Sequence, residues 1–441
     1  MADSYWAKRR WGRRSFLAGA GALSGAAFVA ACGGGDDKKS TSSTTQATTA
    51  AGGAAAQATT AATAAKQLAE VKLGGMIDRT GATANVGKPL GEGSLDYNAY
   101  ANGANVYGRK LAWVEFDNGY NADRGKEGYK KFVESDKVSA VLSFGTPITD
   151  AIQPLSAEDH IPIFTPGFGL GESVDGKKFP YLFIGAASYW DQAMALMGYF
   201  KDNWKDSSRK PKVYYMYYGN AAGRNPLELI KAQAPKLNLD LVGTLEVPGT
   251  ATDLTQQMLE VKSKDPDFVM GHFFGAIPAL ALKALQQVGI NPEKYYALVW
   301  GTGEGDYAAA GSAAEGTFGL QFTPLVTDKP KAFTDMQEWH AKNGKTIDPT
   351  KLGDSVYYMR GMYNVALLSA GIKAAGDKDK VSGEDAKKGY ESIKDDTLFG
   401  LSPGVTFTAD DHGGSRKVRL YQFKGGKQNM IKDWFEGPKP S

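Results

Sequence analysis

The residues best suited to binding chemistry lie in two short loops. Thr146 followed by Pro147 fits the N-cap and first turn of a helix, whose free N–H groups attract a carboxylate. Loop 166–169 reads Pro-Gly-Phe-Gly, in which the glycines let the backbone approach a ligand and Phe168 can cover its apolar part. Either loop alone could be structural, with Thr146 capping a helix and the glycines turning the chain. Together they predict a cradle for a small molecule that carries a carboxylate.

These loops end two apolar runs that enclose a helical segment. Residues 140–144 and 161–165 have the composition of strands, and residues 148–159 have helical spacing. In a parallel sheet such a crossover is right-handed, and ligands bind beyond the carboxyl ends of the strands. We therefore expect both loops to face the same crevice.

Strand-like and helix-like segments alternate through most of the folded part. Predicted strands are 71–77, 110–116, 212–217, 241–247, 268–273 and 297–300, and predicted helices are 86–102, 122–134, 227–236, 253–263 and 279–288. This alternation predicts an α/β fold with parallel sheets. The chain has 441 residues, enough for two such domains.

The start of the chain has the features of an export signal. Basic residues precede a small, apolar run that is too short and glycine-rich for a stable membrane-spanning helix. The arginines 13–14 resemble a twin-arginine export motif, and residues 29–32, Val-Ala-Ala-Cys, resemble a bacterial lipobox. We expect a twin-arginine-type lipoprotein signal peptide, 1–31, and lipidation of Cys32. The alternative is a buried helix over 15–31, with Cys32 as an ordinary core thiol.

Residues 32–68 are mostly Gly, Ser, Thr, Ala and Gln, which cannot bury enough apolar surface to become ordered. We expect this segment to be a lipidated, flexible linker between a membrane and the folded part. The chain has 51 Lys and Arg against 48 Asp and Glu, and much of the small excess lies in the leader. This balance gives no indication of a nucleic-acid-binding surface.

The sequence contains no catalytic or metal-binding motif. The four histidines lack the spacing of a zinc site, and a single cysteine cannot form an internal disulfide. Neither a nucleophile elbow nor a phosphate-binding loop is present. Glu304 and Asp306 could act as the paired carboxylates of an exported hydrolase, but no second acid is placed across the crevice. We expect no catalytic residue, no metal and no cofactor.

Six stretches carry a resemblance to a known family. They are LGGMIDRTG (73–81), YGRKL (107–111), EFDN (115–118), IPIFTPG (161–167), DPDFV (265–269) and AEGTF (314–318). In this order they resemble ABC-transporter substrate-binding lipoproteins of the branched-chain amino acid (Leu/Ile/Val-binding) type. The resemblance implies the periplasmic binding protein type I fold, with two doubly wound parallel-sheet lobes joined by three hinge crossovers. The ligand would be held between lobes that close around it.

The resemblance also implies where the lobes divide. Lobe 1 would comprise 71–186 plus 323–403, and lobe 2 would comprise 187–322 plus 404–441. The three crossovers would lie near 184–190, 319–323 and 401–407.

Residue by residue, the resemblance implies a site built from both lobes. Its members would be Thr146, Gly167, Phe168 and Gly169 from lobe 1 and Tyr218, Asn220, Phe273 and Glu304 from lobe 2. Glu304 falls about where the family has an acid that pairs with the ammonium group of an amino acid. Pro147 and Gly169 replace hydroxyl residues common in that family, which shifts the expected ligand toward a larger or more apolar one.

Several of these assignments have alternatives. At least one of Phe273 and Phe274 should be a core residue, because neighbours in a strand point to opposite faces. Arg224 could clamp a carboxylate or lie solvated at a helix start. Trp190 could stack on the ligand or wedge the hinge.

The expected function is that of an extracytoplasmic, membrane-anchored receptor without chemistry of its own. It would capture a small amino acid or related amide or carboxylate and deliver it to the permease and ATPase of an ABC importer. Aromatic or aliphatic acids are the alternative ligands, a sensor subunit is an alternative role, and an exported hydrolase is a further one. We expect a monomer that binds no nucleic acid.

Overall fold

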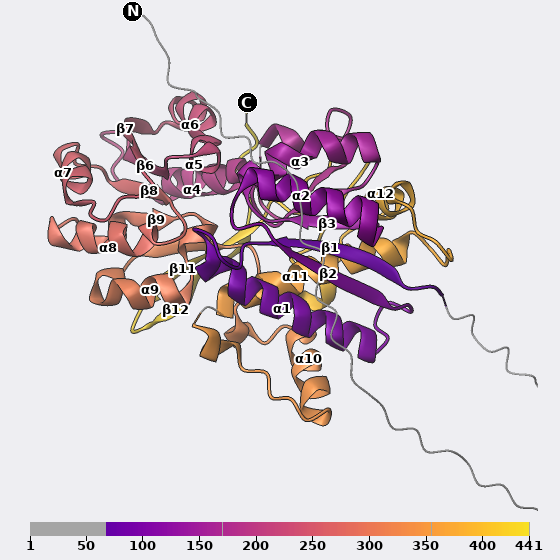
Figure 1. Cartoon of the computed structure of the whole chain (residues 1–441). Helices are drawn as coiled ribbons and strands as arrows, with labels where there is room; N and C mark the ends of the chain where they lie inside the picture. Colours follow the sequence, from indigo (N-terminus) through magenta and orange to yellow (C-terminus); the bar gives the residue numbers. More distant parts are fainter. Residues whose placement is uncertain (1–67, 170, 354, 441) are drawn as a thin grey trace, which may run out of the picture. The chain divides into compact units, whose positions relative to one another are not determined.

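The structure is a computed structural model that describes residues 68–169, 171–353 and 355–440, all within the unit Ala65–Ser441. The expected signal peptide, Cys32 and nearly all of the expected linker lie outside the described residues. Two sheets form in the described part, each flanked by helices (Figure 1).

The first sheet is parallel throughout and has the strand order β2-β1-β3-β4-β5. Its strands are β1 (Val71–Ile77), β2 (Leu111–Asp117), β3 (Ala140–Ser143), β4 (Ile163–Thr165) and β5 (Leu182–Ile184). Helices α2 and α3 lie on one face, and α1 and α11 lie on the other (Figure 1). Alternation along β1 explains this, because Met76 joins the cluster under α2 and α3 while Leu73 and Ile77 join the cluster under α1.

The second sheet has the order β12-β11-β10-β9-β8-β6-β7. Its strands are β6 (Lys212–Tyr218), β7 (Asp240–Val247), β8 (Phe268–His272), β9 (Tyr295–Ala297), β10 (Phe318–Gln321), β11 (Val418–Lys424) and β12 (Lys427–Phe435). Strands β6 to β10 are parallel, as predicted, whereas β11 and β12 are antiparallel. They form a hairpin whose turn residues, Gly425 and Gly426, have φ values of 63° and 72°, which glycine adopts at low cost.

The helices fall into two groups. Those around the first sheet are α1 (Ala84–Gly103), α2 (Ala122–Lys131), α3 (Thr146–Asp159), α10 (Lys331–Lys342), α11 (Ser355–Ala374) and α12 (Gly383–Glu391). Those around the second sheet are α4 (Tyr189–Asn203), α5 (Ala221–Arg224), α6 (Leu227–Gln233), α7 (Thr255–Ser263), α8 (Ile277–Gln287) and α9 (Glu304–Ala310). The chain passes between the two sets three times, after β5, after β10 and before β11, so the two-lobed α/β fold with three crossovers is confirmed. The third crossover lies later than the expected 401–407, because Phe407 packs on Phe183 and Gly413 pairs with Ile184 of the first sheet.

Helix α11 is buried along almost its whole length and packs tightly on α1. Glycines make this approach possible, because a Cβ at Gly93 would lie 2.0 Å from the carbonyl oxygen of Tyr358, and one at Gly361 would lie 1.9 Å from that of Leu90. This contact holds the first turn of α11 at the junction of the lobes.

Two local predictions were wrong. Helix α3 begins one residue earlier than expected, so Thr146 occupies its first turn and Gly145 is the N-cap, with a φ of 109° and no side chain to cap the helix. The predicted strand over 297–300 ends at Ala297, and Val299–Gly301 form a 3-10 turn instead. Two hydrogen bonds hold Trp300 in this turn. Its indole N–H donates to the carbonyl oxygen of Gly167, and its carbonyl oxygen accepts a bond from the Tyr357 hydroxyl.

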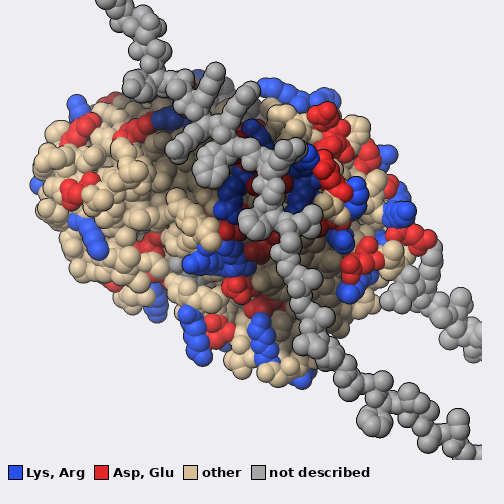
Figure 2. All heavy atoms as spheres, in the orientation of Figure 1, with Lys and Arg blue, Asp and Glu red and all other residues tan. Residues whose placement is uncertain are grey.

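Charged side chains of both signs intermingle on the face shown in Figure 2. Lys126 and Asp123 of α2 lie 3.6 Å apart, and Lys130 of α2 lies 3.7 Å from Glu134, just past the end of this helix. Pairs of this kind are exposed and add little stability. No helix of the described residues is long and apolar enough to cross a membrane.

Candidate ligand-binding site

A small cavity lies where the carboxyl ends of both sheets meet. Its lining comes from loops after four strands of lobe 1 and from α4 and the loops after β8 and β9 of lobe 2; the residues are Thr83, Val86, Tyr120, Phe144, Gly145, Thr146, Phe168, Tyr189, Phe274 and Trp300. In lobe 1 the strand order reverses between β1 and β3, and in lobe 2 it reverses between β6 and β8. Open α/β sheets bind their ligands at such reversals.

The cavity is narrow in this conformation. Its free volume is about 20 Å³, which holds about one water molecule. A larger ligand therefore enters only when the lobes part or the lining rings rotate.

The β1–α1 loop is shaped by a buried carboxylate. Asp78 accepts hydrogen bonds from the N–H groups of Gly81 and Thr83, at 2.6 and 2.8 Å, and from the Thr83 hydroxyl at 2.6 Å. These bonds fix the loop so that Thr83 is the last residue before α1. Thr83 and Val86 line the cavity, so the start of this helix borders it. A second helix, α3, also starts at the cavity, and the partial positive charge of two helix N-termini favours an anionic group there.

Thr146 lies in the cavity wall and is only 2% exposed. Its hydroxyl makes no hydrogen bond of ordinary geometry, although it interacts with the phenol of Tyr189 across the lobes. Burial raises the pKa of Tyr189 well above its usual value, and the Thr146 hydroxyl opposes part of that rise. The Tyr189 hydroxyl is protonated at neutral pH, as an ordinary tyrosine is, and can donate or accept a hydrogen bond.

The two glycines of loop 166–169 do not line the cavity. Gly169 packs within lobe 1, where a Cβ would lie 2.8 Å from Ile184, and Gly167 lies at the junction of the lobes. Gly167 has a φ of 78°, and a Cβ there would lie 2.6 Å from the ring of Phe322. Its carbonyl oxygen accepts hydrogen bonds from Gln192 Nε2 at 2.9 Å and from Trp300 Nε1 at 3.2 Å. Both donors belong to lobe 2, so this carbonyl joins the lobes, while Phe168 lines the cavity.

Aromatic rings form most of the remaining wall. The ring of Trp300 lies 6.0 Å from that of Phe144 and 6.3 Å from that of Phe168, and the ring of Tyr120 lies 6.2 Å from that of Phe274. Burial raises the pKa of Tyr120, while a hydrogen bond with Asn220 opposes the rise. Among the described residues that line the cavity, none is an Asp, Glu, Lys or Arg.

The structure brings some of the sequence-predicted residues into the cavity and others close behind it. Thr146 and Phe168 line it directly. Tyr218 stacks on Phe274 with 4.2 Å between the ring centroids, and Asn220 caps α5 while contacting Tyr120. These two residues support the lining from lobe 2.

Phe273 and Glu304 lie elsewhere. Phe273 is 1% exposed and belongs to the apolar cluster beneath α8, whereas its neighbour Phe274 faces the cavity. Glu304 starts α9, and its carboxylate accepts hydrogen bonds from the Ser355 hydroxyl and the Val356 N–H group of α11.

Trp190 and Arg224, for which two roles each were considered, both lie outside the cavity lining. Trp190 does not line the cavity, and its indole donates to the carbonyl oxygen of Asn225 at 3.3 Å. Arg224 forms an exposed pair with Glu246, at 2.7 Å from Nε and 2.5 Å from Nη2.

Arg360 is the residue that sequence reasoning missed. It is fully buried on α11, and its Nη2 donates to the carbonyl oxygen of Val299 at 2.8 Å and to Gln321 Oε1 at 2.7 Å, both in lobe 2. Its guanidinium also lies 4.7 Å from the ring centroid of Trp300 and 4.6 Å from that of Phe322. The signal in the sequence was an arginine in the middle of a mostly apolar helix.

This two-lobed fold with its cavity between the sheets defines a class of binding proteins. The chain belongs to the periplasmic binding protein family, whose profile matches residues 70–428. No curated protein matched the chain.

Three solved structures illustrate the similarity in fold. One, from the Pseudomonas fluorescens group and described as an ABC transporter permease, shares 25% identity over 84% of this chain and 93% of its own, with a TM-score of 0.76. A branched-chain amino acid ABC transporter protein from Thermus thermophilus with bound valine shares 23% identity over 84% and 96%, with a TM-score of 0.72. A fatty acid ABC transporter substrate-binding protein from Thermomonospora curvata shares 19% identity over 84% and 93%, with a TM-score of 0.69.

Proposed function

We propose that this chain is the extracytoplasmic solute-binding component of an ABC importer and that it captures a small carboxylic acid with an apolar body. The observation that carries this proposal is the cavity itself, lined from both lobes by aromatic rings and bordered by two helix starts. The helix starts suit the carboxylate, and the rings suit the apolar body. The captured acid would pass to the permease and ATPase.

The lining favours an acid without an amine over an amino acid. A buried ammonium group needs an anionic partner or several hydrogen-bond acceptors, and no carboxylate is among the described lining residues. Similarity in fold does not decide between ligands, because the similar structures include a valine-bound protein and one named for fatty acids.

A small amino acid is the second candidate. Tyr120 and Tyr189 line the cavity together with Thr83 and Thr146. Hydroxyl oxygens of these side chains are candidate acceptors for an ammonium group.

Matched ligand pairs separate these candidates. We would strip the purified protein of ligand and measure calorimetric binding of isovalerate against leucine, and of phenylacetate against phenylalanine. The proposal predicts that an acid binds at least about tenfold more tightly than its amino acid counterpart. The reverse order would establish the second candidate, and no binding by this panel or by a broader acid screen would contradict the proposed site.

Two variants test whether binding uses this cavity. Thr146→Val keeps the shape of the side chain and removes its hydroxyl, and Phe168→Ala opens the wall. Both should weaken binding, and Phe168→Ala should weaken it more because it loses apolar contact area. Phe399→Ala, at an exposed ring outside the cavity, is the control and should bind as the parent does.

We also propose that the protein is anchored to a membrane through a lipid on Cys32, where it acts as a monomer. The basis is the leader sequence and the lipobox-like residues 29–32. In a host that processes lipoproteins, Cys32→Ser should move the protein from the membrane fraction to the soluble extracytoplasmic fraction. Retention of the variant in the membrane fraction would contradict this anchor.

A further inference from the structure

Glu304 of lobe 2 supplies a cap to a helix of lobe 1. One carboxylate oxygen accepts a hydrogen bond from the Ser355 hydroxyl at 2.5 Å, and the other accepts one from the Val356 N–H at 3.1 Å. Ser355 begins α11, a helix of 20 residues. The first N–H groups of a helix have no partner within it, and a negative charge at this end is favourable. Glu304 meets both needs from outside the helix.

The two partners belong to different lobes. Glu304 begins α9, between β9 and β10 of the second sheet. Helix α11 packs on α1 against the first sheet, with the close contacts at Gly93 and Gly361. Movement of the lobes about the crossovers would therefore separate the carboxylate from the helix start, while contacts within each lobe would persist.

Neighbouring contacts show that the first turns of α11 form a continuous junction with lobe 2. The hydroxyl of Tyr357 donates to the carbonyl oxygen of Trp300 at 2.9 Å, and Arg360 donates to that of Val299. Glu304 stands at the outer end of this row, in the wall of an open crevice shared by both lobes. The aromatic cavity is lined by Trp300 and does not include Glu304.

We propose that Glu304 is a closure latch: a positioning residue that stabilises the conformation with the lobes together and does not touch the ligand. This inference rests on the proposed function only in that closure traps a ligand. In the parted conformation both the carboxylate and the helix start would be hydrated. Closing replaces that water with two charge-assisted hydrogen bonds. The apparent affinity for a ligand depends on the fraction of protein that is closed. By raising that fraction, Glu304 would raise the apparent affinity without contacting the ligand.

Glu315 provides a matched control in the same lobe. Its carboxylate oxygens accept hydrogen bonds from the N–H groups of Gly425 and Gly426, at 2.9 and 3.0 Å. The chemistry is the same, a glutamate that accepts two hydrogen bonds, but both partners lie in the hairpin of lobe 2. Replacing Glu315 should loosen this hairpin without changing lobe closure.

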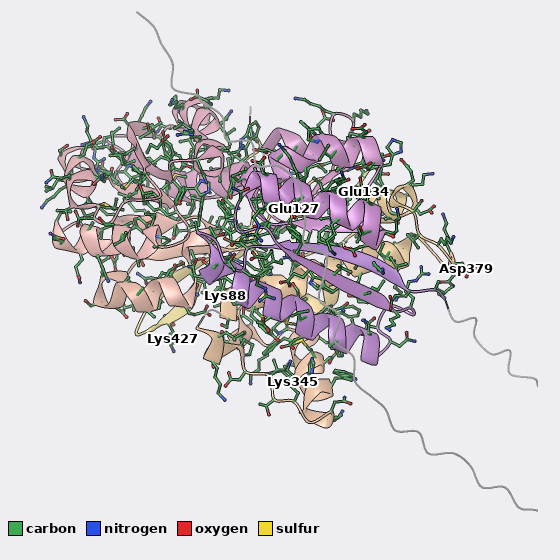
Figure 3. The ribbon with its side chains drawn as sticks, in the orientation of Figure 1. Lys88, Glu127, Glu134, Lys345, Asp379 and Lys427 are labelled. Carbon is green, nitrogen blue, oxygen red and sulfur yellow. The ribbon has the colours of Figure 1, made fainter. Side chains whose placement is uncertain are left out.

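The test measures closure without any added small molecule. Spin labels would be placed at Lys88→Cys of α1 (Figure 3) and Lys283→Cys of α8, two exposed positions on different lobes and away from the β11–β12 hairpin, with the native Cys32 changed to Ser. Pulsed electron resonance then gives the distribution of distances between the labels in ligand-stripped protein. Glu304→Gln should shift the ratio of short to long distances toward the long ones by about tenfold, because neutral hydrogen bonds are weaker than charge-assisted ones. Glu315→Gln should leave the ratio unchanged.

A second variant approaches the same contact from the other lobe. Ser355→Ala should shift the distances in the same direction as Glu304→Gln, and the double variant should shift them by less than the two single effects combined. This variant also keeps the test valid if Glu304→Gln folds poorly by circular dichroism. An unchanged distribution in folded Glu304→Gln or in Ser355→Ala, or an equal shift in Glu315→Gln, would overturn the latch.

Failure of the latch is distinguishable from failure of the proposed function. The distance measurement uses stripped protein and does not depend on which small molecule binds. If Glu304→Gln reduced binding of leucine but not of isovalerate and left the distances unchanged, Glu304 would be a ligand contact and the latch would be wrong.

Discussion

The indole N–H group of Trp300 donates a hydrogen bond to the carbonyl oxygen of Gly167, 3.2 Å away and in the other lobe. The same indole ring forms part of the cavity wall. One side chain therefore lines the cavity and also joins the lobes. A ligand in this cavity that displaced or ordered the ring would act on the bond between the lobes as well.

Replacing Trp300 with Phe should weaken closure and ligand binding together. The variant keeps a flat aromatic ring but loses the donor to Gly167, which costs about 1 kcal/mol for a buried hydrogen bond. Labels at positions 88 and 283 should report a larger parted fraction, and calorimetry should show weaker binding. Trp190→Phe is the control, because that indole bonds to Asn225 within lobe 2 and does not line the cavity. Equal effects of the two replacements would contradict the role of Trp300.

Gly167→Ala should destabilise the protein more than a glycine replacement at a similar backbone conformation. Gly167 and Gly108 have φ values of 78° and 74°, so both replacements carry the strain of a left-handed residue, about 1 kcal/mol. At Gly167 the added Cβ would also meet the ring of Phe322 at 2.6 Å, whereas at Gly108 nothing lies within 4 Å. We expect a further loss of about 1 to 3 kcal/mol at Gly167 alone. Urea unfolding of both variants checks this difference, and equal losses would rule out the steric explanation.

Arg360→Lys should be strongly destabilising although it keeps the charge. The guanidinium donates to two acceptors in lobe 2 and lies against the rings of Trp300 and Phe322. A lysine ammonium cannot reproduce this planar stacking, and it carries a larger hydration cost into a buried site. We expect a loss of about 2 to 4 kcal/mol in the free energy of unfolding.

The matched control for that replacement is Arg209→Lys. Arg209 also lies over an indole, 4.5 Å from the ring centroid of Trp204, and pairs with Asp267, but its side chain is exposed. Replacing Arg209 should change the free energy of unfolding, measured for both variants with urea, very little. A similar shift in both variants would mean that burial at the lobe junction is not what makes Arg360 important.

His272 should make the protein less stable as the pH falls. Burial lowers the pKa of His272 from 6.5 to about 3, so the folded protein keeps the ring neutral while the unfolded chain takes up a proton. The contribution is present above pH 6.5 and is lost as the pH falls toward 3, with a limiting slope of about 1.4 kcal/mol per pH unit. Urea unfolding between about pH 7 and about pH 4 should show a shallower pH dependence in His272→Gln.

The comparison is between the parent and His272→Gln, which lacks the buried imidazole. Carboxylates contribute equally to the parent and the variant, so the difference between the curves isolates the histidine. Parallel curves for the parent and His272→Gln would contradict the prediction.

Periodicity in the sequence was sufficient to predict most of the elements. The predicted strand 71–77 coincides with β1, and the predicted helix 122–134 covers α2 and runs on into a π-helical turn. These segments follow local rules, alternation in strands and spacing of about 3.6 residues in helices. The strand predicted over 297–300 failed because Trp300 bonds to partners far along the chain.

For the site, the sequence by itself determined which loops meet: parallel strands followed by helices place Thr146 and Phe168 at the carboxyl ends of neighbouring strands. Only the tertiary structure decided which of Phe273 and Phe274 faces the cavity. Both residues follow the end of β8, where the alternation of side chains in a strand no longer fixes which way each one points. It also decided that the Glu304 carboxylate caps α11 and that Arg360 reaches lobe 2. Such contacts depend on how the two lobes approach each other. They join residues that are far apart in the sequence, so no local sequence pattern predicts them.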